Sequence, residues 1–276
     1  MNNLKGQLVL VGVAVLGVAM ILVAILMPSS PPLPPEDDQG TEQVEGQGEG
    51  RTETGEPEGG AESRTVEPIE PADEPAHARL LRAASAGDTR TIASMVGMGV
   101  GVDTEASQAD VEAIATPPLE VGMTALMLAA RDSDLTTVNA LLEAGANPNT
   151  QAASGVTPLM LAAQRGQTDL VVALLGAGAD PTLETAEGRT ALMLAARAGA
   201  HRAVSLLLEA GADPNEGDAD GVTPLMHAAG GNHMDTVIVL LGGGADATAT
   251  DGRGRGAMDR AGDGPVADLL REAAGG

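Results

Sequence analysis

The sequence contains no phenylalanine, tryptophan, tyrosine or cysteine, and its only lysine is Lys5. Without aromatic side chains, the core has to be packed from Leu, Val, Ile, Met and Ala, which suits small units that approach closely. The absence of cysteine excludes disulfides, thiolate zinc sites and cysteine nucleophiles. The formal net charge of −24 disfavours nucleic-acid binding, because that function requires a large basic field.

One long apolar run stands at the amino terminus. Residues 8–27 are 20 consecutive uncharged residues, and at about 1.5 Å per residue a helix of this length crosses the ~30 Å hydrocarbon layer. A cleaved secretory signal is the alternative, but its apolar region is usually about 7–15 residues long. No A-x-A-like cleavage site precedes Pro28. We therefore predict an uncleaved transmembrane anchor that places the chain in a lipid bilayer.

Basic residues flank this run on one side only. Lys5 and the amino group precede it, and no Lys or Arg follows until Arg51. The positive-inside rule then predicts that residues 1–7 form a short cytoplasmic tail and that the remainder lies outside. High Ala and Gly content with Arg favoured over Lys hints at a GC-rich bacterial genome. We expect a single-pass protein of the inner (plasma) membrane with a periplasmic or extracytoplasmic domain.

Residues 28–75 form an acidic stretch rich in Pro, Gly and Glu. They hold 14 acidic residues against Arg51 and Arg64, so their net charge is −12. Such a segment cannot bury enough apolar surface to offset its ordering entropy, which predicts a disordered linker. It could serve as a solvated spacer, or it could fold back onto a basic surface of the following domain; the sequence leaves both open.

The rest of the chain, residues 76–276, is organised by a period of 33 residues. Successive copies open at Gly122, Gly155, Gly188, Gly221 and Gly254. A fixed period of this length indicates stacked copies of one small supersecondary unit.

Each copy reads as two short helices and a polar loop. Thr157 and Pro158 are placed to cap and begin a first helix. Val171, Leu174 and Leu175 fall on one face of a second helix. Gly166 suits the left-handed residue that ends the first helix, and Asn232 can replace glycine at the equivalent position. We predict an all-α repeat solenoid of helix-turn-helix units with β-hairpin loops.

The pattern G-x-T-P-L-x-x-A-A, then V-x-x-L-L, then G-A-D-P-N resembles the ankyrin repeat, over about 200 of the 276 residues. One departure is systematic. The family usually has His after Thr-Pro-Leu, where it forms hydrogen bonds around the hairpin base. This chain has methionine there, at Met127, Met160, Met193 and Met226. We expect the fold to survive and the hairpins to be looser.

The terminal units diverge, as the ends of a stack do. Ala83-Ala84 precedes Ala129-Ala130 by 46 residues instead of 33, so 13 extra residues should form an enlarged finger or loop around residues 105–121. The last unit begins near Gly254 and is about four residues short. With both divergent caps, we predict six units.

Residues that could carry chemistry are few. Serine-nucleophile motifs and the phosphate-binding Walker loop are absent. His227 and His233 are six residues apart rather than the four that would place them on one helix face. His227 replaces a leucine of the other units, and we interpret it as a partly buried core histidine. Residues 213–221 only faintly resemble a calcium loop and lack its final glutamate. We therefore predict no enzymatic activity, cofactor or metal.

The resemblance supplies candidate partner-binding positions, because ankyrin partners usually meet the hairpin tips and the exposed side of the first helix. Carried over to this sequence, these are Arg131, Asp132, Gln164, Arg165, Glu187, Arg189, Arg197, Asp220, Val222, Arg253 and Arg255. The set holds six of the nine arginines that follow residue 120. Since arginine forms bidentate contacts to carboxylates, an acidic partner surface is expected. Alternatively, the arginines at 131, 165 and 197 simply complement helix C-termini.

Together these features predict a membrane-tethered ankyrin repeat adaptor that binds another protein through its concave groove and hairpin tips. A passive structural or spacer element of the cell envelope, or an inhibitor subunit that regulates an enzyme, is the alternative. The sequence leaves the partner, the pathway and the oligomeric state open.

Overall fold

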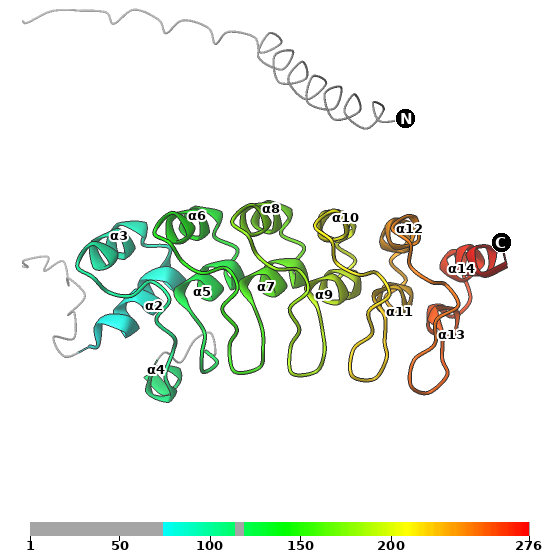
Figure 1. The fold of residues 1–276 in the computed structure, drawn as a ribbon, viewed down its shortest axis with the longest axis horizontal. Coiled ribbons are helices and arrows are strands. Elements are labelled where there is room, and N and C mark those ends of the chain that lie inside the picture. The colour runs from blue at the N-terminus through cyan, green and yellow to red at the C-terminus, as the bar shows by residue number, and fades with distance from the viewer. Residues whose placement is uncertain (1–73, 114–118, 276) are drawn as a thin grey trace, which may run out of the picture. The chain divides into compact units, whose positions relative to one another are not determined.

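The computed structural model describes residues 74–113 and 119–275, and Figure 1 shows their arrangement. The predicted transmembrane segment 8–27 and residues 28–73 of the predicted linker lie outside these ranges. Within the described ranges, each helix is too short or too polar to cross a bilayer.

The described residues form six pairs of antiparallel helices and one additional short helix. In Figure 1 the first helices of the pairs make one row, the second helices make another, and the loops project beyond the first row. The pairs are α2 (Ala76–Ala86) with α3 (Thr89–Gly97), α5 (Ala125–Arg131) with α6 (Leu135–Glu143), α7 (Pro158–Gln164) with α8 (Thr168–Gly176), α9 (Ala191–Arg197) with α10 (His201–Glu209), α11 (Pro224–Gly230) with α12 (Met234–Gly242), and α13 (Ala257–Ala261) with α14 (Pro265–Gly275).

Buried threonines begin four of the first helices. The side-chain oxygen of Thr157 accepts the backbone N–H of Met160 at 3.2 Å, as the N-cap prediction requires. The same bond recurs in α5, α9 and α11 at 3.4 Å. The turns after these helices need left-handed backbone, and Gly166 (φ 66°) and Asn232 (φ 55°) supply it as predicted. Ser133 (φ 63°) occupies the equivalent place after α5, where the repeat pattern did not predict a left-handed residue.

The core is a continuous row of apolar side chains through all the units. Leu174 and Val171 on α8 are 0% exposed, as their spacing predicted. The four methionines that replace the family's histidine are also buried, with at most 1% of their surface exposed: Met127, Met160, Met193 and Met226. The polar network of the usual histidine is therefore absent from this position.

Oxygen atoms in the loops themselves replace that network. The carboxylate of Asp218 accepts the backbone N–H groups of Asp220 (3.0 Å) and Val222 (2.9 Å). Asp251 and Thr185 accept the equivalent pairs of N–H groups in their own loops. These side chains brace the loops from within, which differs from the looser hairpins expected from the missing histidine.

The loops between units are hairpin-shaped but contain no β-strand in the described ranges. Each is closed by a bond such as Thr185 N–H to Arg189 O (3.0 Å), and one isolated bridge joins Thr250 and Gly256. The prediction of β-hairpins is therefore wrong as regards strands, because the loop arms are too short to form a ladder. Neighbouring loops are nevertheless joined through their backbones, since Ala186 N–H donates to Ser154 O at 2.8 Å and Ala219 N–H to Glu187 O at 3.0 Å.

The enlarged loop between the first two units contains the helix α4 (Gln108–Ala113). Asp110 at its first turn is buried and accepts hydrogen bonds from the Ser107 backbone (2.7 Å) and hydroxyl (2.6 Å). His77 at the start of α2 contacts the same carboxylate at 3.1 Å. The insertion therefore packs onto the first unit through a polar contact.

Leu174→Ala should lower the free energy of unfolding by about 2–5 kcal/mol, because it removes a fully buried side chain from the middle of the stack. Val172→Ala is the matched control on the same helix. Its side chain is 52% exposed, so the change should stay within about 0.5 kcal/mol. Urea titration followed by far-UV circular dichroism measures both, since the chain has no Trp or Tyr for fluorescence. Equal effects of the two variants would contradict the assigned core.

Candidate functional site

Five of the predicted binding residues line one cleft of about 250 Å³ between the loops that precede α9, α11 and α13. We call it the hairpin cleft. The predicted residues in it are Arg189, Asp220, Val222, Arg253 and Arg255, and its other lining residues are Asp218, His227, Asp251 and Arg260.

Four of the remaining predicted residues lie elsewhere. Gln164 and Arg165 line a second depression of about 320 Å³ at the helix turns, beside residues 198–203. Arg131 and Asp132 pair with each other at 3.0 Å at the end of α5, and Asp132 also accepts a hydrogen bond from Ser85 of the first unit. The predicted set is therefore distributed over separate places and does not form a single surface.

Glu187 and Arg197 lie near the hairpin cleft without lining it. Glu187 holds the guanidinium of Arg189 through a 2.6 Å ion pair. Arg197 is exposed at the end of α9, and its charge acts on His227.

The cleft is built from columns of residues that stand 33 positions apart. One column holds Asp218 and Asp251, and a second holds Val222 and Arg255. In a third column, the earlier units have leucine, the fifth unit has His227 and the last unit has Arg260. Sequence reasoning named Asp218 only as part of a weak calcium-like pattern and missed Asp251 and Arg260. Comparison of the positions within the first and third columns would have shown that ionisable residues first appear in the last two units.

Asp251 is the centre of a closed cluster in the last unit. Its side chain is 1% exposed and accepts bonds from two groups of Arg255 (2.9 and 3.1 Å) and from Arg260 (2.6 Å). The backbone N–H of Arg255 is the largest influence on its pKa. Together with the N–H of Arg253 and the two guanidinium groups, it outweighs burial and holds the pKa of Asp251 well below its usual range.

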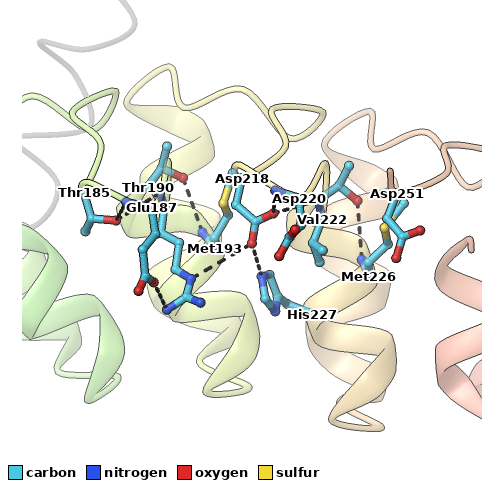
Figure 2. A network of polar contacts seen from close by, with 12 residues as sticks. Thr185, Glu187, Thr190, Met193, Asp218, Asp220, Val222, Met226, His227 and Asp251 are labelled. Carbon is cyan, nitrogen blue, oxygen red and sulfur yellow. Dashed lines mark hydrogen bonds and ion pairs between the residues drawn. The ribbon is translucent and has the colours of Figure 1, made fainter. Parts of the chain in front are cut away.

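Asp218 in the preceding unit has the equivalent position but an open arrangement. Figure 2 shows His227 directed toward its carboxylate, with His227 Nε2 at 3.8 Å and Arg189 Nε at 4.0 Å from Asp218 Oδ2. Both distances are too long for hydrogen bonds. In the described ranges, Arg189 Nε, His227 Nε2 and Arg260 Nε are buried atoms without a hydrogen-bond partner. The cleft therefore gathers nitrogen atoms that the protein itself leaves unsatisfied.

His227 is partly buried, as predicted, with 16% of its side chain exposed. Burial lowers its pKa, and the neighbouring charges of Arg197, Arg260 and Arg189 lower it further, while Asp218 acts in the opposite direction. The lowered pKa favours the neutral imidazole at pH 7. No three His, Asp or Glu side chains in residues 74–113 and 119–275 are arranged to hold a metal ion.

Comparison with protein families matches ankyrin repeats (3 copies) to residues 80–185 and 159–251. Together the matches cover more than half of the chain, so it belongs to the ankyrin repeat family, as its sequence pattern predicted. A comparison with curated proteins finds no match. Ankyrin repeats are typically interaction domains without enzymatic activity.

Asp251→Asn should lower the urea midpoint at pH 7, because it removes the charge that holds two arginines in the last unit. The lowered pKa means that this carboxylate stabilises the fold above the ordinary carboxyl pKa of about 3.9, and that the stabilisation declines as pH falls below it. The difference between wild type and variant should therefore shrink between pH 4 and pH 2. Asp220→Asn, at an exposed carboxylate of the same cleft, is the control and should change little at either pH. A difference that stays constant with pH would contradict this role.

Proposed function

We propose that the chain is a membrane-tethered adaptor that binds an acidic surface of another protein through its hairpin cleft. Membership of the ankyrin repeat family supports protein–protein interaction. The tether and the acidic partner go beyond the family, and they rest on the apolar run at residues 8–27 and on the arginines of the cleft.

The hairpin cleft is the observation that carries the proposal. It is a concave site on the side of the stack where the loops project, and four arginines line it: Arg189, Arg253, Arg255 and Arg260. Asp251 pairs with Arg255 and Arg260, whereas the Arg253 side chain is exposed. Arginine at a concave surface favours carboxylates of a partner, because its planar fork donates to both oxygens.

The double variant Arg189→Glu with Arg253→Glu tests the binding face. It should reduce crosslinking of the native partner in membranes by about tenfold or more, as loss of central arginine contacts does at interfaces. The matched control is Arg165→Glu with Arg202→Glu, which changes the net charge equally but alters the second depression at the helix turns. Capture should survive in the control. If both variants are folded and both lose crosslinking of the partner equally, the assignment of the binding face to the cleft is contradicted.

Deletion of residues 8–27 tests the tether. The deleted chain should appear in the soluble fraction after an alkaline wash, whereas the intact chain should stay with the membranes. Deletion of residues 28–47 removes an equal length of linker and should leave the chain in the membrane fraction. Protease added to spheroplasts, which lack the outer barrier, should cut the ankyrin domain, since we place only residues 1–7 in the cytoplasm. Protection of the domain from that protease would reverse the proposed orientation.

A passive spacer of the cell envelope is the alternative, and the same crosslinking decides between the two. A discrete partner band supports the adaptor, whereas its absence in intact membranes supports the spacer.

A further inference from the structure

The buried nitrogen atoms of the hairpin cleft indicate what kind of group binds there. Arg189 Nε and Arg260 Nε each carry a hydrogen at all accessible pH values, because the guanidinium group is not deprotonated in proteins. Both atoms are buried without an acceptor in the described ranges. A buried donor without an acceptor destabilises the protein. A ligand that brings an acceptor into the cleft would therefore satisfy groups that the fold leaves unsatisfied.

The chain contains its own example of the satisfied arrangement. Asp251 collects the guanidinium groups of Arg255 and Arg260 at 2.6–3.1 Å. One unit earlier, Asp218 Oδ2 stands 4.0 Å from Arg189 and 3.8 Å from His227. Backbone N–H groups hold Asp218 Oδ1 within its loop, and Oδ2 stays beyond hydrogen-bond distance of Arg189 and His227.

Charge and size narrow the choice of that group. Four arginines and three aspartates line the cleft, so its lining carries more positive than negative charge. Glu187 lies outside the lining and pairs with Arg189. The negative charges of Asp218 and Asp220 repel an anion, and the positive charges of the arginines offset this repulsion. The volume of the cleft, about 250 Å³, is sufficient for a side chain of a partner.

We propose that the hairpin cleft binds the carboxylate of a single aspartate or glutamate side chain of the partner protein. Arg189 Nε and Arg260 Nε donate to its oxygens, and His227 also donates when its ring proton is on Nε2. The inference rests on the proposed function in one respect, since the partner supplies the side chain. It goes further by naming the group that is anchored and the three atoms that hold it.

Titration of the ¹⁵N-labelled full chain in an uncharged detergent tests this directly. The probe is glutamate capped at both ends, and capped glutamine is the neutral control of the same shape. Capped glutamate should shift the Nε–H signals of Arg189 and Arg260 in a saturable manner, because these groups gain a charged acceptor. Capped glutamine should bind about tenfold more weakly or worse. Equal shifts of these Nε–H signals with both probes, or no shift with either probe, would overturn the proposed carboxylate site.

Variants that carry the residue of an equivalent position in another unit should still fold, so they test binding separately from folding. His227→Leu installs the residue found at 128, 161 and 194, and Arg189→Val installs the residue found at 156 and 222. Each should weaken binding of capped glutamate about tenfold or more while keeping the circular dichroism spectrum. Arg90→Val on the exposed surface of α3 is the control and should leave the titration unchanged. Unchanged binding in His227→Leu and Arg189→Val would also overturn the proposal.

Crosslinking of the native partner separates this inference from the proposed function. If the partner is captured but capped glutamate does not bind, the adaptor stands and the carboxylate anchor fails. If capped glutamate binds but no partner is captured from membranes, the cleft is a carboxylate site and the adaptor function fails.

Discussion

The structure depends on the backbone register between neighbouring loops. Each loop donates an N–H group to a carbonyl of the loop before it, as from Ala186 to Ser154 and from Gly252 to Asp220, both at 2.8 Å. These contacts require glycine at the loop tip. A Cβ on Gly155, whose φ is +82°, would lie 2.8 Å from the backbone of Thr185. The register keeps residues that are 33 positions apart side by side along the whole stack.

Because the register is fixed, function can arise by substitution within a column while the scaffold stays the same. The inward leucine of the earlier units becomes His227 and then Arg260, and the loop position at Thr185 becomes Asp218 and then Asp251. Charge therefore gathers around the last three loops and forms a cleft there. The side-chain oxygens at this loop position also brace the loops, which explains how the fold does without the histidine that the buried methionines replace.

The periodic features were predictable because they follow from spacing alone. The helix caps, the buried face of Leu174 and the left-handed turn at Asn232 all appear where the repeat placed them. The grouping of the binding residues was not predictable in the same way. Arg165 shares the family's binding pattern with Arg189, yet the helix turn carries Arg165 into a different depression. The site around Asp251 depends on side-chain directions at positions 255 and 260, which a periodic pattern does not specify.

The unsatisfied donors of the hairpin cleft are hard to explain by stability. Burying such a group without a partner costs about 1–3 kcal/mol, and the neighbouring units show apolar residues at the same positions, such as Leu194 for His227 and Val222 for Arg189. The last unit pairs its own charges through Asp251, so charge in a column need not remain unpaired. An energetic cost that equivalent units avoid is better understood as the requirement of a binding site than as part of the scaffold. The junction of the fourth, fifth and sixth units is therefore where we propose that this protein makes its selective contact.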